Sequence, residues 1–406
     1  MISEASNQSR RGSAAEVFAA FLWLGLTSFG GPVAHLGYFR REFVGRRRWL
    51  DESAYADLVA LCQFLPGPAS SQVAFALGLA RGGGAGGCLA WLGFTLPSAI
   101  LLILFAGIAN ALNGPIAAAA LHGLKIVAVA VVGQAVWGMA RTLAPDAQRI
   151  IIALCGGLLV AAFPGSFAQI AAILLGAMLG LILCRQIIAI QTGYLSFSIS
   201  RRLGIVSLIA FAAILLGAPL LAATVHSDAL RLFDAFFRSG ALVFGGGHVV
   251  LPLLKSAVVD PGLVTANSFL AGYGAAQAVP GPLFTVSAYL GAVATVPPNG
   301  LMGATIALAG IFLPGMLVLM GALPFWDEFR KRSNAQAAMR GINAVVVGIL
   351  AAAFYNPVWT GAIFGMRDFI IAAAGFLLLT VWKAPPLIVV VATTASSVAI
   401  VSLFQA

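Results

Sequence analysis

Charged residues are scarce in this 406-residue chain: Asp, Glu, Lys and Arg make up 9% of it, whereas hydrophobic residues make up 61%. The mean hydropathy is +1.00, and soluble domains usually carry about 25% charged residues, so this composition excludes a soluble globular protein. Five segments contain no charged residue at all: 82–124, 203–225, 297–325, 341–366 and 384–406. Because about 20 apolar residues suffice to cross a bilayer, we predict an all-α integral membrane protein with several spans.

Cysteine is also rare, and the common catalytic and metal-binding patterns are missing. The four cysteines stand singly in apolar surroundings and form no C-x-x-C pair, so we interpret them as small hydrophobic residues in the interior: Cys62, Cys88, Cys155 and Cys184. No G-x-S-x-G motif and no His/Glu spacing typical of a metal site occurs. We therefore expect no metal and no cofactor, and an intramembrane enzyme is only a remote alternative to a transporter.

Two short motifs occur twice, in the same order. Phe29-Gly30-Gly31 is matched by Phe244-Gly245-Gly246 at an offset of 215 residues, and the Pro-Gly-Pro motif at 66–68 by the one at 280–282 at an offset of 214. This duplication predicts a first transport repeat (15–185) and a second one (229–406), joined by a linker and connecting span (186–228) and preceded by a tail (1–14). Both motifs break helices, and matching broken helices in two halves are typical of transporter binding sites.

The distribution of arginine predicts that the two halves are inverted. The loop 40–48 contains five arginines, but its counterpart, 252–267, carries only Lys255 and Asp260. Conversely, the loop around 108–121 is uncharged, whereas its counterpart contains Arg330, Lys331, Arg332 and Arg340. Cytoplasmic loops carry the excess of Lys and Arg, so both arginine-rich loops and the N-terminal tail should be cytoplasmic. The net charge of +10 is therefore a topology signal and not a sign of nucleic-acid binding.

The segments around the breaks are too short to be ordinary spans. Residues 15–28 would give about 21 Å of helix, which is less than the roughly 30 Å of hydrocarbon. We therefore predict re-entrant hairpins at 15–45 and 50–81 from the cytoplasmic face, and at 229–258 and 263–294 from the opposite face. Since irregular backbone at membrane depth survives only inside protein or beside a wet cavity, the four breaks should converge on one cavity.

The repeated motifs also predict an anion site. In each Pro-Gly-Pro motif one proline ends a helix and the other suits the start of the next, which puts Gly67 and Gly281 near N-caps with hydroxyl residues following. A helix N-terminus with free N–H groups attracts anions; the alternative is a simple kink. The candidate substrate-binding residues of these motifs are Gly30, Gly31, Gln63, Pro66, Gly67, Pro68, Ser70, Ser71, Gly245, Gly246, Gln277, Pro280, Gly281, Pro282 and Thr285.

Charged and titratable residues inside the predicted spans complete the candidate site. Lys125 is the only charge between Arg81 and Arg141 and is expected near mid-depth, where a lysine costs about 2.5–3.5 kcal/mol, so we predict that it binds substrate together with Arg238. Asp57 either titrates, as a proton-coupling group, or pairs with a loop arginine. His35 and His248, which follow the two Phe-Gly-Gly motifs, either contact the anion, relay a proton or cap a helix.

With these motifs, both halves resemble the chromate ion transporter family in its long two-domain form. The resemblance rests on Phe29-Gly30-Gly31-Pro32, Trp49-Leu50, Gln63 to Pro68, and their counterparts in the second half. It implies a multi-pass protein of the bacterial inner membrane that exports chromate from the cytoplasm and confers chromate resistance. The partners expected are a chromate or sulfate-like oxyanion and the lipid bilayer, with a homodimer left open; transport of sulfate or another oxyanion, including sulfate uptake, is the alternative.

Overall fold

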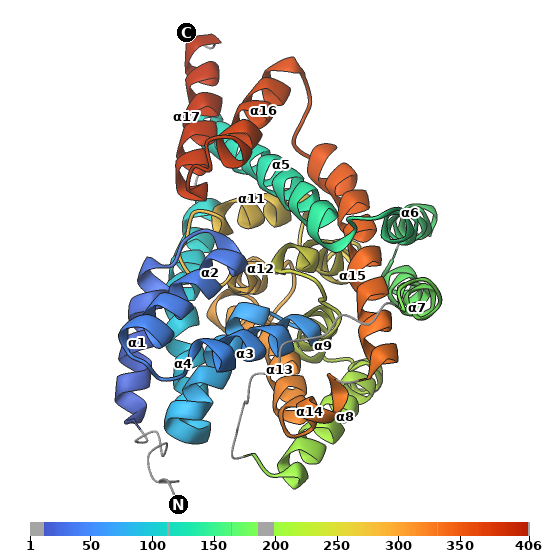
Figure 1. Ribbon diagram of the computed structural model, residues 1–406. Coiled ribbons are helices and arrows are strands. Elements are labelled where there is room, and N and C mark those ends of the chain that lie inside the picture. The colour runs from blue at the N-terminus through green and yellow to red at the C-terminus, as the bar shows by residue number, and fades with distance from the viewer. Residues whose placement is uncertain (1–11, 112–113, 164, 186–198, 331, 405–406) are drawn as a thin grey trace, which may run out of the picture.

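The computed structural model describes residues 12–111, 114–163, 165–185, 199–330 and 332–404, and every regular element in these ranges is helical (Figure 1). Six helical stretches in them are long and apolar enough to cross a membrane: 69–109, 115–143, 201–225, 300–329, 333–359 and 386–403. This confirms the prediction of an all-α protein built from membrane-spanning helices. Most of the predicted tail (residues 1–11) and the start of the predicted linker (186–198) lie outside the described residues.

The two halves contain corresponding helices in the same order. The first half contains α1 (Ala14–Thr27), α2 (Gly31–Phe39), α3 (Glu52–Phe64), α4 (Ala69–Ala111, divided into two helices by non-helical backbone at Gly82 and Gly83), α5 (Pro115–Leu143), α6 (Ala147–Ala162) and α7 (Ser166–Leu183). After α8 (Arg201–Val225), the second half contains α9 (Asp228–Ala241), α10 (Val250–Leu254), α11 (Ala266–Ala276), α12 (Val286–Ala292), α13 (Gly300–Ala322), α14 (Trp326–Phe329), α15 (Ser333–Ala353), α16 (Met366–Thr380) and α17 (Pro386–Phe404). Short π or 3-10 segments extend several of them: Arg40–Arg46, Gly247–Val249, Lys255–Val259, Leu283–Thr285, Leu323–Phe325 and Phe354–Trp359.

Equivalent side chains start the equivalent helices of the two halves. Ser13 and Ser227 cap α1 and α9, and each side-chain oxygen accepts a hydrogen bond from the backbone N–H three residues further on. Asp51 and Thr265 cap α3 and α11 in the same way. Such caps satisfy N–H groups that cannot be paired within the helix. The internal repeat is therefore visible in the helix N-caps as well as in the breaks.

Glycine ends the helices at the predicted breaks. Gly30 (φ 103°) lies between α1 and α2, Gly31 (φ 77°) is the first residue of α2, and Gly67 (φ 121°) lies between α3 and α4. In the second half, Gly246 (φ 154°) and Gly281 (φ 97°) take the corresponding positions. Only glycine adopts these left-handed conformations without steric cost, so the four predicted breaks are confirmed.

Each half packs one of its long helices against helices of the other half. α5 packs against α16 and α17 of the second half, while α15 packs against α6 and α7 of the first (Figure 1). Glycines allow these helices to approach closely: a Cβ on Gly341 would lie 2.0 Å from the Gly176 carbonyl oxygen, and one on Gly123 2.7 Å from Thr394 Cα. Small residues serve helix contacts in membranes in this way. Neither half could keep this packing alone, so the halves form one unit.

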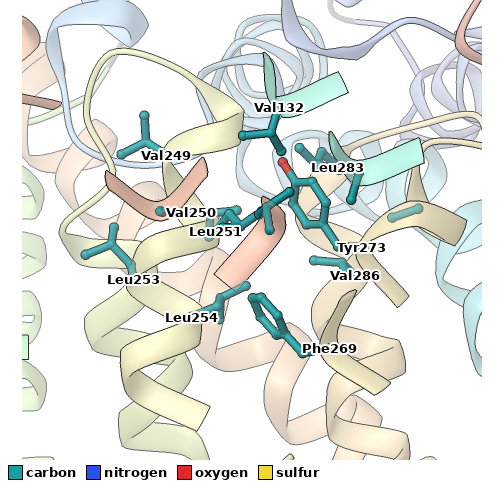
Figure 2. Close-up of a cluster of buried hydrophobic side chains, with 14 of the residues drawn as sticks. Val132, Val249, Val250, Leu251, Leu253, Leu254, Phe269, Tyr273, Leu283 and Val286 are labelled. Atoms are coloured by element: carbon teal, nitrogen blue, oxygen red, sulfur yellow. The ribbon is translucent and has the colours of Figure 1, made fainter. Parts of the chain in front are cut away.

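The short helices of the second half are held by a buried apolar core. Figure 2 shows side chains of α10 and α11 gathered around Tyr273 and Phe269, with Val132 of α5 reaching in from the first half. A second core packs α1, α2, α3 and the start of α4 against Leu319 at the end of α13 and Trp326 of α14. These cores fix the helix ends that lead into the four breaks.

Candidate functional site

The helix breaks of the two halves are bonded to each other in a crossed pattern. The backbone N–H of Gly67 donates to the Val243 carbonyl oxygen at 2.8 Å, and the N–H of Gly281 donates to the Ser28 carbonyl oxygen at 2.9 Å. Val243 and Ser28 directly precede the two Phe-Gly-Gly motifs. Each Pro-Gly-Pro turn is therefore fastened to the Phe-Gly-Gly turn of the other half, and the breaks of the two halves lie together. Their opening onto one shared cavity stays a prediction.

The two Pro-Gly-Pro glycines are closely packed rather than open. A Cβ on Gly67 would lie 2.9 Å from Gly315 Cα, and one on Gly281 would lie 3.1 Å from the Phe94 carbonyl oxygen. Nearby, the Thr285 hydroxyl donates to the Pro282 carbonyl oxygen at 2.6 Å. The N–H groups of Gly67 and Gly281 are thus used by the other half, and a helix fills the space beside each Cα, so these two N–H groups are not free to bind an anion.

A glutamine that the sequence analysis did not single out secures the first of these turns. Gln72 is fully buried, and its Nε2 donates to the Pro66 and Gly315 carbonyl oxygens, at 2.9 Å each. It sits one turn into α4, where a buried amide within reach of a broken backbone could have been suspected. Gln72 holds the Pro-Gly-Pro turn of the first half on α13.

Polar side chains without partners line the elements that meet at the breaks. His35 on α2 is fully buried, its Nδ1 lies 3.5 Å from Ser70 Oγ, and its ring packs edge-on against Phe94. Several buried polar atoms have no hydrogen-bond partner among the described residues: Ser28 Oγ, His35 Nε2, Ser71 Oγ, Thr95 Oγ1 and Ser287 Oγ. Leaving such a group unpaired costs about 1–3 kcal/mol, so these groups are suited to form hydrogen bonds with a polar ligand.

A pocket of about 340 Å³ opens beside the first break. It is lined by Phe29, Gly30, Tyr38, Gln134, Leu379, Lys383, Ala384, Pro385 and Pro386. The first half contributes α2 and α5, and the second contributes the elbow between α16 and α17. Lys383 is the charged residue of this lining, and the sequence analysis missed it. The signal was present, since Lys383 is the only charge after Asp368 and stands two residues before Pro385-Pro386.

Lys125 is not brought together with the breaks. Its Nζ donates to Asn267 Oδ1 at 2.8 Å, in the first turn of α11. The Pro280 break follows the other end of α11, about 13 Å away at 1.5 Å per residue. Asn343, the repeat counterpart of Lys125, does lie at a break: its Oδ1 is 3.3 Å from the position that a Cβ on Gly245 would take.

The remaining charged candidates are paired. Arg238 forms an ion pair with Asp234 one turn earlier on α9, a spacing of four residues that the sequence could have revealed. Asp57 accepts hydrogen bonds from Arg330 Nη1 at 2.8 and 2.9 Å, and both side chains are buried. Trp326 Nε1 also donates to Asp57 Oδ1 at 3.2 Å. The pairing interpretation of Asp57 is therefore confirmed, with a partner from the other half.

The polar candidates of the second half differ from those of the first. His248 Nδ1 lies 2.7 Å from the Tyr273 hydroxyl, whereas His35 has no such phenol partner. Gln277 is half-buried and its amide lies 3.4 Å from the Tyr273 carbonyl oxygen, whereas Gln63 is exposed at the end of α3. The two halves thus share the order of helices and breaks, but equivalent polar side chains near the breaks have different partners and exposure.

Comparison with known proteins places both halves in one family. The sequence profile described as chromate transporter matches residues 15–181 and 230–398. A chromate transport protein of Pseudomonas aeruginosa is 29% identical over 386 residues, which cover 91% of this chain and 87% of that protein. A chromate transport protein of Cupriavidus metallidurans is 27% identical over 340 residues (82% and 80%), and a probable chromate transport protein of Synechococcus elongatus is 27% identical over 357 residues (82% and 81%). No solved structure matches the chain significantly.

Proposed function

Because this chain belongs to the chromate transporter family, and is thus a membrane transporter and not an enzyme, we propose that it exports chromate from the bacterial cytoplasm across the inner membrane and so confers chromate resistance. Chromate at neutral pH is largely a tetrahedral dianion. The observation that carries the proposal is the junction of helix breaks from both halves, beside a pocket whose lining contains a lysine and no carboxylate.

The proposed binding region is the first break and the polar groups around it. Gly30 borders the pocket, and the buried His35, Ser70 and Ser71 lie on α2 and α4, the helices that follow the two breaks of the first half. An oxyanion there would find hydroxyl and imidazole donors and no fixed negative charge. Lys125 and Arg238, both engaged with neighbouring side chains, are assigned to the route of the anion rather than to this pocket.

We also propose that the two halves are inverted in the membrane, with the four broken segments as re-entrant hairpins. The proposal is supported by the opposite distribution of arginine in equivalent loops. It is supported further by the reciprocal packing of α5 and α15 on helices of the other half. Inverted repeats with discontinuous helices allow one site to face the two sides of the membrane alternately.

Export of a dianion fits the energetics of the cell membrane. Moving each negative charge out of a negative-inside compartment gains about 2.3 kcal/mol per 100 mV, so roughly 4.6 kcal/mol for chromate. In oriented proteoliposomes, chromate should therefore leave the side that corresponds to the cytoplasm faster when that side is made negative. Sulfate, with the same shape and charge, should compete. Chromate flux no faster than in protein-free liposomes contradicts the proposal, and sulfate flux that chromate does not inhibit favours a sulfate transporter.

The same vesicles test the inverted arrangement. Gly45 and Ser333 are exposed and belong to the arginine-rich loops of the two halves. Cys62 and Cys184 are buried as expected, but Cys88 is exposed, so all four native cysteines are replaced first. Single cysteines at 45 and 333 should then react with an impermeant thiol reagent from the same face. Labelling from opposite faces would refute the inversion.

A further inference from the structure

The lysine of the pocket differs from the other described lysines in having no side-chain partner among the described residues, neither a hydrogen-bond acceptor nor a carboxylate. Lys125 donates to Asn267, and Lys255 is paired with Asp260 at 3.1 Å. Lys383 lies exposed at the elbow between α16 and α17, and no carboxylate of the described residues lies within ion-pairing distance of it. Its ammonium group is therefore available to an anionic ligand.

The backbone of Lys383 is itself unusual. Its φ of 51° lies in the left-handed region, which disfavours a residue with a Cβ by about 1–2 kcal/mol. The loop of the first half between α6 and α7 also contains a residue with positive φ, but this residue is Gly165 (φ 116°), directly before α7, whereas Lys383 follows the end of α16. Side chains held in unfavourable backbone conformations cluster at functional sites. Lys383 is therefore held in a backbone conformation in which glycine would be less strained.

The opposite wall of the pocket completes a small polar enclosure. Gly30 carries no side chain and starts α2 without a side-chain cap. Gln134 on α5 donates to the Leu379 carbonyl oxygen at 3.3 Å, which ties α5 to the end of α16 just before the elbow. Lys383 therefore faces the first break across a gap whose walls come from different halves.

The equivalent break of the second half is closed. A Cβ on Gly245 would lie 3.2 Å from Leu143 Cδ1, and one on Gly246 would lie 3.7 Å from Met139 Sδ. At the first break, by contrast, Gly30 borders the pocket, a Cβ on it would meet only Ala34 Cβ of α2 itself, at 3.1 Å, and a Cβ on Gly31 would meet nothing within 4 Å. The structure is thus asymmetric, with one break open to a charged pocket and its counterpart packed against side chains.

We propose that Lys383 is the cation that binds the transported oxyanion, in the pocket between the α16–α17 elbow, Gly30 and Gln134. This inference rests on the proposed function, since it names the group of the same site that neutralises the substrate. It assigns to the elbow the role for which the sequence had suggested Lys125. The ligand class is a tetrahedral dianion, which the ammonium group and the amide of Gln134 can bind without competition from a carboxylate.

Three substitutions of Lys383 separate its charge from its effect on the fold. Lys383→Gly removes the ammonium group and places glycine in a left-handed position, so the purified protein should melt at the wild-type temperature or above. Its affinity for radiolabelled chromate in equilibrium dialysis should fall about 10- to 100-fold, the usual value of a hydrogen bond to a charged group. Lys383→Gln should lose a similar factor, whereas Lys383→Arg keeps the charge and should bind within about tenfold of wild type.

Lys255→Gln is the matched control, because it removes one positive charge from a lysine that does not line the pocket. It should bind chromate with wild-type affinity. Wild-type affinity in Lys383→Gly would overturn the inference. If the wild-type protein binds sulfate and not chromate, and Lys383→Gly abolishes that binding, the assignment of Lys383 is supported and chromate as substrate is rejected. Binding of neither anion by the wild type rejects both.

Discussion

Replacing Arg330 with alanine should lower the free energy of unfolding by about 3–5 kcal/mol, because it leaves the carboxylate of Asp57 buried without its countercharge. Arg330 Nη1 contacts both oxygens of Asp57, and the exposed fractions of the two side chains are 6% and 1%. The effect should appear as a large drop in melting temperature and in the yield of monodisperse protein in detergent.

The neighbouring ion pair provides an internal control. Arg330 also contacts Asp327 at 2.7 Å, but the Asp327 side chain is 64% exposed. Pairs with an exposed partner contribute about 0–1 kcal/mol, so Asp327→Asn should melt almost as the wild type does. The double substitution Asp57→Leu with Arg330→Met should recover most of the lost stability, because it removes both charges together. Equal melting of Arg330→Ala and Asp327→Asn would contradict this account.

The Asp57–Arg330 pair joins the helix before the first Pro-Gly-Pro turn to the second half. Asp57 lies on α3, which leads directly into the Pro-Gly-Pro turn, and Arg330 follows α14 of the second half. Phe64, at the end of α3, also packs edge-on against Trp326, with ring centroids 5.7 Å apart. The pair therefore fixes the approach to one break on the other half of the protein.

Gly281→Val should prevent most of the protein from folding, rather than leave it folded and only block the binding of substrate. Valine at a φ of 97° is sterically strained by about 1–2 kcal/mol, and its side chain would meet Ser98 and the Phe94 carbonyl oxygen at 3.0–3.1 Å, adding about 1–3 kcal/mol of overpacking. The crossed hydrogen bond to Ser28 would be strained as well. We expect low yield and a lowered melting temperature.

Gly262→Val is the control that separates the cost of backbone strain from the cost of overpacking. Gly262 has a similar φ of 79°, but a Cβ there would meet nothing within 4 Å. Gly262→Val should therefore lose only the stability that the strained backbone conformation costs, about 1–2 kcal/mol. If Gly281→Val instead folds and melts like the wild type but does not transport, the glycine serves the approach of the anion, as the sequence had suggested, and the packing explanation is wrong.

The helix breaks and helix limits could be predicted from the sequence because their causes are local. Glycine and proline determine where α1, α3 and their counterparts end, and the serine and aspartate caps determine where they begin. The predicted arm 15–28 is observed as Ala14–Thr27, and 50–65 as Glu52–Phe64. Likewise, the convergence of the breaks followed from the general cost of unpaired backbone inside a membrane.

What the sequence could not reveal depends on contacts between distant segments. The pairing of Asp57 with Arg330 joins residues 273 positions apart, and the exchange of α5 and α15 between halves leaves no periodic signal. Lys125 illustrates the same limit: its isolation in an apolar run predicted a site residue, but Asn267 at the start of α11 accepts its hydrogen bond. Lys383 was equally isolated, and only the fold of the elbow brings it to a break.

The position of bound chromate tests the central claim most directly. Crystals of the wild-type protein equilibrated with chromate should show the anomalous scattering of chromium in the pocket bounded by Gly30, Gln134 and Lys383. Crystals of Lys383→Gly, treated in the same way, should lack this peak. A chromium peak elsewhere, for example beside Lys125 and Asn267, with the pocket empty in both proteins, would contradict the account.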